Sequence, residues 1–152
     1  MSKLSLCFPV YNKVDAIDDV VESFLERADL ARVQFVFSDN ASSDGSTEKL
    51  LKWKEKLNGV YARVESTLSI NESWFSCIRL VDTAFFKLCL GDDPCVADPV
   101  RFLDRFDDPA VQFIVGKTLV EAEDGHTGKE YFELVHQCRS QIVPTMSDAE
   151  KI

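Results

Sequence analysis

Short apolar runs alternate with stretches of helical periodicity along this chain, and this alternation constrains its fold more than any other feature. Apolar runs at 4–8, 33–37, 60–65 and 85–90 predict strands, and the apolar residues between them recur at helical spacing. This order is typical of a mostly parallel sheet covered by helices. We therefore expect an α/β fold with three layers, α/β/α, around a mostly parallel central sheet.

Particular side chains set the expected limits of these elements. Pro9 lacks an amide hydrogen for the strand ladder and is expected to end the first strand. Asp15 is placed to cap the first helix. The side chains expected to be buried are Ile17, Val20, Val21, Phe24 and Leu25 in the first helix, Leu50, Leu51 and Leu57 in the second, and Trp74 and Phe75 in the third. The run at 85–90 is expected to be a buried strand.

The size and composition of the chain predict one globular domain over 1–152. Its 152 residues are 45% hydrophobic and 28% charged, as in ordinary soluble proteins. A net charge of −9 argues against nucleic acid as a partner. The five cysteines show no CxxC spacing and mostly lie in apolar runs, which indicates free thiols in a reducing compartment. Without a signal peptide or an apolar run of about 20 residues, we expect a cytoplasmic protein.

After residue 94 the pattern predicts further elements. We expect a short helix around 99–106, strands near 111–115 and 117–122, and a last helix around 129–139. A turn at EDGHTG separates the last strand from the last helix, and the final SDAEKI is expected to be a frayed tail.

Three polar clusters follow the carboxyl ends of predicted strands: PVYNK at 9–13, SDNASSDGS at 38–46 and GDDP at 91–94. Open α/β sheets bind ligands in the crevice outside the carboxyl ends of their strands. We therefore expect these clusters to form one site, although they lie far apart in the sequence.

The residue types in the clusters suit a nucleotide beside a metal ion. Asp92 and Asp93 are adjacent carboxylates, whose mutual repulsion is relieved by a proton or a cation. Hard oxygen donors of this kind suit Mg²⁺ or Mn²⁺, which often share substrate phosphates. Asp39 and Asn40 offer opposite hydrogen-bonding preferences to the edge of a base, and Tyr11 offers a flat surface for stacking.

Plainer readings of the same residues stay open. Asp39 and Asp44 are also suited to turns and helix caps, and Tyr11 can simply fill the top of the sheet. His126 and His136 lack a second ligand at metal-binding spacing. An acid-pocket α/β domain of the response-regulator type would bind a metal without any preference for nucleotides.

The order and spacing of PVYNK, SDNASSDGS and NESWFSCIRLVDTAFFKLCLGDD resemble the successive motifs of inverting family-two glycosyltransferases with the GT-A fold. The resemblance covers about 4–125 and leaves a C-terminal helix and tail over 126–152. It implies transfer of a sugar, with inversion, from a nucleoside-diphosphate sugar linked to UDP, dTDP or GDP to an acceptor hydroxyl. It also implies Mn²⁺ or Mg²⁺ as cofactor.

The resemblance assigns roles to individual residues. The implied donor site consists of Pro9, Tyr11, Asn12, Asp39, Asn40, Asn71 and Asp92, with Asp93 as the metal ligand. Within it, Tyr11 and Asp39 hold the nucleobase. Asp92 lies toward the ribose, and Asn71 approaches the diphosphate.

The chain also departs from the family pattern. Pro94 follows the acidic pair where a third acid or an apolar residue is usual. Family members usually continue well past this point, with an acceptor site and a carboxylate that acts as general base. No pattern selects a base among Glu121, Glu123, Asp124 and His126, so the catalytic residue is unknown. The alternative is a shortened, non-catalytic donor-binding module or the N-terminal part of a longer transferase, and a homo-oligomer is compatible with either.

Overall fold

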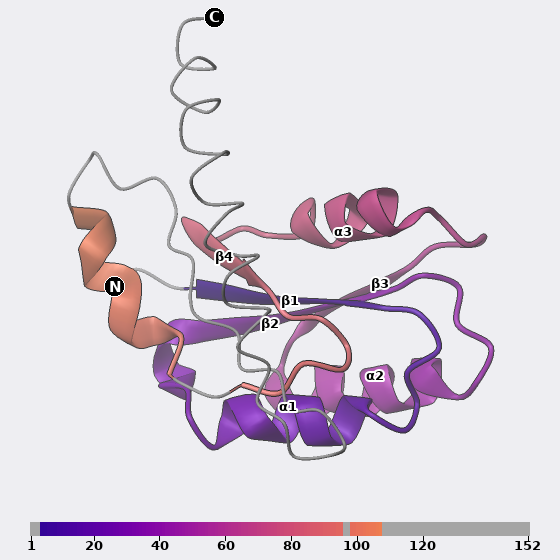
Figure 1. Ribbon diagram of the computed structural model, residues 1–152, viewed down its shortest axis with the longest axis horizontal. Helices are drawn as coiled ribbons and strands as arrows, with labels where there is room; N and C mark the ends of the chain where they lie inside the picture. The colour runs from indigo at the N-terminus through magenta and orange to yellow at the C-terminus, as the bar shows by residue number, and fades with distance from the viewer. Residues whose placement is uncertain (1–3, 96–97, 108–152) are drawn as a thin grey trace, which may run out of the picture. The chain divides into compact units, whose positions relative to one another are not determined.

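The computed structural model describes residues 4–95 and 98–107 (Figure 1). The chain divides into two units, Met1–Phe113 and Ile114–Ile152, and all described residues lie in the first. The elements are β1 (Leu4–Val10), α1 (Ile17–Leu25), the 3-10 helix η1 (Leu30–Arg32), β2 (Val33–Asp39), α2 (Ser46–Leu57), β3 (Val60–Arg63), α3 (Ile70–Ile78), β4 (Phe85–Leu88) and the 3-10 helix η2 (Val100–Asp107). The strands predicted at 111–115 and 117–122 and the helix at 129–139 lie outside the described residues.

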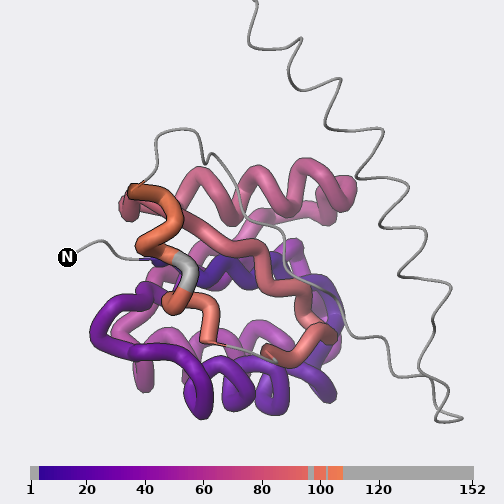
Figure 2. The backbone as a smooth tube through the Cα atoms, turned by 60° about the vertical axis from the view of Figure 1, so that its left-hand side comes forward, coloured from indigo at the N-terminus to yellow at the C-terminus, as the bar shows by residue number. Residues whose placement is uncertain are grey.

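The four described strands form one parallel sheet in the order β3-β2-β1-β4. Helices α1 and α2 cover one face of this sheet and α3 covers the other (Figures 1 and 2). The predicted α/β fold with three layers and a parallel sheet is therefore confirmed. One domain over 1–152 stays a prediction.

The main core lies between the sheet and the α1 and α2 helices. Alternate side chains of a strand point to the same face, so Phe8 of β1 meets Phe35 and Phe37 of β2 there. The ring centroid of Phe8 lies 5.4 Å from that of Phe24 in α1, 6.0 Å from that of Phe35 and 5.3 Å from that of Phe37. These four rings fix the first helix and both central strands to one another.

The opposite face of the sheet is covered by α3, whose N-terminus has a capping box formed by Ser69 and Glu72. Cys77 of α3 packs there against Cys7 and Val36, and all three side chains are fully buried. In the main core, burial raises the pKa of the Cys89 thiol, and the buried cysteines on both faces pack as small hydrophobes.

The prediction that Trp74 and Phe75 are core residues is wrong. Phe75 is 59% exposed and Trp74 is only partly buried. The buried side of α3 consists of Ser73 and Cys77, four residues apart, and Phe75 lies halfway between them on another side of the helix.

Pro9 does not end β1, which continues to Val10. The Cys7 carbonyl accepts a hydrogen bond from the Cys89 amide (2.8 Å), so the backbone groups of Cys7 face β4. Backbone groups two residues apart face the same neighbouring strand, so the backbone of Pro9 also faces the β4 side. The last residue pair between β1 and β4 is Cys7 with Leu88, and Pro9 lies beyond it. The proline therefore removes no ladder hydrogen bond between β1 and β4.

Two helix predictions and one strand prediction are also wrong in detail. The N-cap of α1 is Ala16 rather than Asp15, and no side chain caps it. Leu51 is exposed because the buried side of α2 runs through Leu50 and Trp53. The strand β4 is only partly buried, with Phe86 exposed, because it lies at the edge of the described sheet.

Gly59, between α2 and β3, permits a close approach that no other residue allows. A Cβ atom added there would lie 2.9 Å from the Phe35 carbonyl oxygen. We expect Gly59→Ala to lower the free energy of unfolding by about 1–3 kcal/mol through overpacking, measured by urea denaturation. In Gly91→Ala the nearest neighbour would be the flexible side chain of Lys13 at 3.2 Å, so a smaller loss is expected. An equal loss in both variants would contradict this explanation.

None of the helices in the described part of the chain has the length and apolar character needed to cross a bilayer.

Candidate functional site

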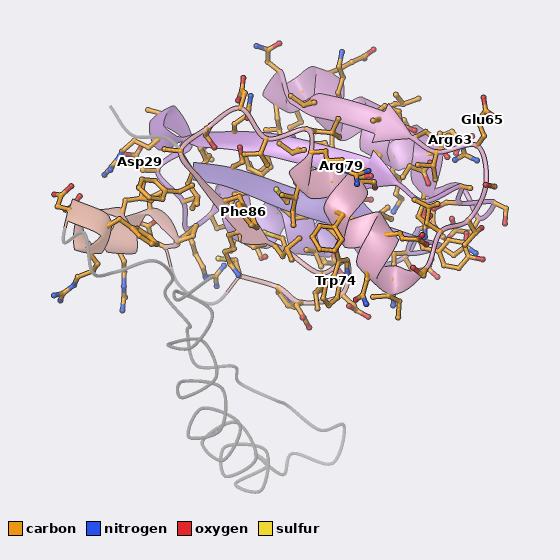
Figure 3. The ribbon with its side chains drawn as sticks, turned by 90° about the horizontal axis from the view of Figure 1, so that it is seen from above. Asp29, Arg63, Glu65, Trp74, Arg79 and Phe86 are labelled. Carbon is orange, nitrogen blue, oxygen red and sulfur yellow. The ribbon has the colours of Figure 1, made fainter. Side chains whose placement is uncertain are left out.

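The carboxyl ends of the parallel strands lie at one edge of the sheet, and the polar clusters extend from there. Register pairs Val10 of β1 with Asp39 of β2, and Asp39 with Arg63 of β3. Figure 3 shows Arg63 at the opposite end of the sheet from Asp29, which precedes β2. The edge is therefore built by three adjacent strands whose last residues lie side by side.

Hydrogen bonds join the first two clusters directly. The Asn12 amide donates to Ser42 Oγ (3.1 Å), and the Ser43 amide donates to Asn12 Oδ1 (2.9 Å). The Lys13 amide donates to Ser46 Oγ (2.9 Å) at the start of α2. Asn12 takes up a left-handed conformation, with φ of 49°, which asparagine tolerates better than most residues. The predicted meeting of these two loops is confirmed.

Asp44 orders the start of α2. Its Oδ1 accepts from the Ser46 amide (2.9 Å) and hydroxyl (2.6 Å), and its Oδ2 accepts from the Val14 amide (2.9 Å). Burial alone would raise the pKa of this carboxyl, but the hydrogen bonds from Ser46 and Val14 outweigh it and leave the pKa lowered. Gly45 precedes the helix with φ of 97°, a conformation that favours glycine. These bonds fit the reading of Asp44 as a turn residue.

In the described part of the chain, one ion pair joins the acidic turn to the first cluster. Lys13 Nζ donates to Asp92 Oδ2 at 2.6 Å, and both side chains are partly exposed. The turn itself is closed by the Asp93 amide, which donates to the Leu90 carbonyl (3.2 Å). Within the described residues, Lys13 thus supplies one positive charge to the acidic turn, and the predicted meeting of all three clusters is confirmed.

Asp39 is fully buried at the end of β2, beneath this edge. Its Oδ1 accepts from the Ser42 amide (2.8 Å), and its Oδ2 accepts from the Thr47 hydroxyl (2.6 Å), the Tyr61 hydroxyl (3.4 Å) and the Arg63 guanidinium. Burial raises the pKa of the carboxyl, but the hydrogen bonds from Thr47, Ser42 and Arg63 outweigh it, so the pKa is lowered. Both oxygens of Asp39 have partners within the chain, and its role toward a base stays a prediction.

The other residues of the predicted donor site lie around the same edge but differ in how far their side chains are exposed. Asn40 is buried, and its side-chain amide makes two hydrogen bonds with the Leu68 backbone, at 3.1 and 2.8 Å. Tyr11 is 48% exposed just after β1, which leaves its ring accessible. Pro9 is partly buried within β1, and Asn71 is exposed in the first turn of α3.

Sequence reasoning missed Arg63 and Lys13. Arg63 ends β3 and donates through Nη1 to Asp39 and Thr47 and through Nη2 to the Ser42 carbonyl (2.9 Å). The available signal was its place near the carboxyl end of the strand predicted at 60–65, because a parallel strand ends at the same edge of the sheet. Lys13 lies within the PVYNK motif, but its partner is 79 residues away in the sequence.

The described residues hold no gathered group of three or more His, Cys, Asp or Glu side chains of the kind that would bind a metal on its own. Asp93 is exposed beside Asp92 on the acidic turn. A hard cation at Asp93 would fit only with further oxygen ligands from a substrate, as Mg²⁺ commonly has with phosphates. Asp93 as a metal ligand stays a prediction.

The chain thus has an open α/β fold, with polar loops joined at the carboxyl edge of its parallel sheet. In folds of this class, ligands bind at that edge. Among solved structures, the chain is similar to S. aureus TarS 1-349 in complex with UDP, with a TM-score of 0.62 and 18% identity over 80% of this chain and 40% of TarS 1-349. The complex of the same protein with UDP-GlcNAc also gives a TM-score of 0.62 over 80% of this chain and 38% of that chain. These likenesses confirm the predicted GT-A type of fold.

Among curated proteins, the chain is 24% identical over 133 residues to abequosyltransferase RfbV of Salmonella typhimurium. The match covers 81% of this chain and 40% of RfbV, so the chain spans about two fifths of the length of this relative. No family model matches the chain. Together with the shared fold, this relative confirms the resemblance to glycosyltransferases that the motifs predicted.

Proposed function

We propose that this chain is a cytoplasmic, family-two glycosyltransferase that binds its donor at the carboxyl edge of the sheet. It would transfer a sugar, with inversion, from a nucleoside-diphosphate sugar to an acceptor hydroxyl. The observation that carries the proposal is the joining of all three motif loops at the carboxyl edge of one parallel sheet by hydrogen bonds and the Lys13–Asp92 ion pair. The UDP and UDP-GlcNAc complexes of the similar TarS structures support a nucleotide-sugar donor.

Different residues at this edge would contact different parts of the donor. Tyr11 is accessible for stacking on a base, and Asp39 lies below with Arg63. Asp92 would lie toward the ribose. Asp93 would hold Mn²⁺ or Mg²⁺ together with diphosphate oxygens, and such a cation neutralises the charge of the leaving diphosphate.

The variant Asp93→Ala tests the metal ligand. We expect it to lose the Mn²⁺-dependent part of its affinity for UDP, GDP or dTDP, a loss of about tenfold or more, as measured by calorimetry with Mn²⁺ and with EDTA. Asp104→Ala is the matched control, because Asp104 is an exposed aspartate in η2, outside the three motif loops. An unchanged Mn²⁺ effect in Asp93→Ala would remove Asp93 from the site.

A second candidate is a donor-binding module without transfer activity. It stays beside the first because a shared fold does not by itself establish catalysis. Donor hydrolysis and transfer measured with Mn²⁺ at high protein concentration separate the two candidates. Tight nucleotide binding without turnover supports the second, whereas turnover supports the first.

A further inference from the structure

Lys13 is held more firmly than an ordinary surface lysine. Its amide donates to Ser46 Oγ (2.9 Å), and its carbonyl accepts from the Ala16 and Ile17 amides at 3.0 and 3.1 Å. A Cβ atom at Gly91 would lie 3.2 Å from Lys13 Cγ, so the stem of the lysine lies directly against the acidic turn. The backbone of Lys13 is therefore fixed while its side chain reaches across to the third loop.

The ammonium group of Lys13 keeps hydrogen-bonding capacity. It has three N–H donors, and within the described residues one of them is used, in the 2.6 Å bond to Asp92. The side chain is 41% exposed. The remaining donors thus face solvent beside the acidic turn.

A diphosphate at this edge would need a positive charge from the protein when no metal is bound. Asp44, Asp92 and Asp93 are exposed there and would repel it. The guanidinium of Arg63 makes three bonds, to Asp39, Thr47 and the Ser42 carbonyl, which hold it against β2 and the loop that follows it. Arg63 has further N–H donors, but Lys13 is held by one side-chain bond within the described residues and is freer to turn toward a phosphate.

We propose that Lys13 is a phosphate-binding residue of the donor site, held in place by Asp92. This inference rests on the proposed function and adds a residue to it. A lysine binds phosphate as a point charge, and its pairing with Asp92 limits the freedom that the side chain loses when the phosphate binds.

The test compares UDP, GDP and dTDP with their nucleosides, in the presence of EDTA, for the wild type and three variants. We expect Lys13→Gln to weaken diphosphate binding by about tenfold, the loss of one charge-assisted hydrogen bond, and to leave nucleoside affinity and the urea midpoint unchanged. Lys13→Arg should retain most of the affinity. Lys54→Gln, an equal change of charge in the last turn of α2, should have no effect.

Each outcome decides the inference. Diphosphate affinity in Lys13→Gln equal to that of the wild type would overturn the role of Lys13 and leave the proposed function standing. An equal loss for diphosphates and nucleosides would indicate a purely structural role and would also overturn it. A wild type that binds no nucleotide with or without Mn²⁺ would refute the proposed function itself.

Discussion

Replacing Asp39 with asparagine should lower the free energy of unfolding at neutral pH by about 2–3 kcal/mol, because a buried carboxylate loses its charge-assisted hydrogen bonds. The asparagine side chain would turn a donor amide or a weaker acceptor toward the Thr47 hydroxyl and the Arg63 guanidinium, which both donate to Asp39 Oδ2. The loss stays below that of a fully buried ion pair, since Arg63 is 39% exposed and water can solvate it. Urea denaturation measures the difference.

The same variant has an expected pH dependence. The folded pKa of Asp39 is lowered, whereas an unfolded aspartate titrates at about 3.9. The stabilisation is therefore complete above the unfolded pKa and is lost as the pH falls through the folded pKa. The difference between wild type and Asp39→Asn should shrink below about pH 4. Asp104→Asn changes an exposed carboxyl, so its free energy of unfolding should differ from that of the wild type by less than about 0.5 kcal/mol. A pH-independent difference for Asp39→Asn would refute the role of its charge.

Nucleotide affinity in Asp39→Asn separates the two roles of this residue. If Asp39 holds a base, as the motif resemblance implies, the nucleotide affinity of Asp39→Asn should fall. The fall should then be larger than the small fraction of unfolded protein in this variant can account for. If affinity is kept while stability falls, Asp39 serves only to position Arg63 and the loop after β2. Comparison with a nucleotide of a different base shows whether specificity changes.

Replacing Phe8 with alanine should cost more stability than any other change considered, about 3–5 kcal/mol, because it leaves a cavity at the centre of the main core. Phe8 is 2% exposed and meets the rings of Phe24, Phe35 and Phe37. The loss removes apolar burial and also the ring contacts that fix α1 to the sheet. The free energy of unfolding from urea denaturation measures it.

The control is the same substitution at an exposed phenylalanine. Phe86 in β4 is 48% exposed, so Phe86→Ala should cost about 1 kcal/mol or less. Equal losses at the two positions would show that the core does not lie where β1, β2 and α1 meet. If Phe8→Ala fails to fold, Phe8→Leu, which retains most of the apolar volume, should still fold with a smaller loss.

Much of the fold and the place of the site could be predicted from the sequence. Apolar runs and helical spacing are local properties, and they predicted the four described strands, the three α-helices between them and the short helix at η2. The position of polar clusters after parallel strands predicted that the clusters containing Tyr11, Asp39 and Asp92 share one edge. Local patterns were less reliable for the limits and faces of elements, as Pro9 and Phe75 show.

The tertiary structure alone decided which side chains pair at that edge. Arg63 reaches Asp39 because β3 lies next to β2 in a register that places both residues at the same level, and no local pattern fixes this register. Lys13 reaches Asp92 because both flank the end of β1 in space while 79 residues separate them in the sequence. Periodicity and turn chemistry report on neighbours along the chain, whereas the charge balance of a site depends on neighbours across the sheet.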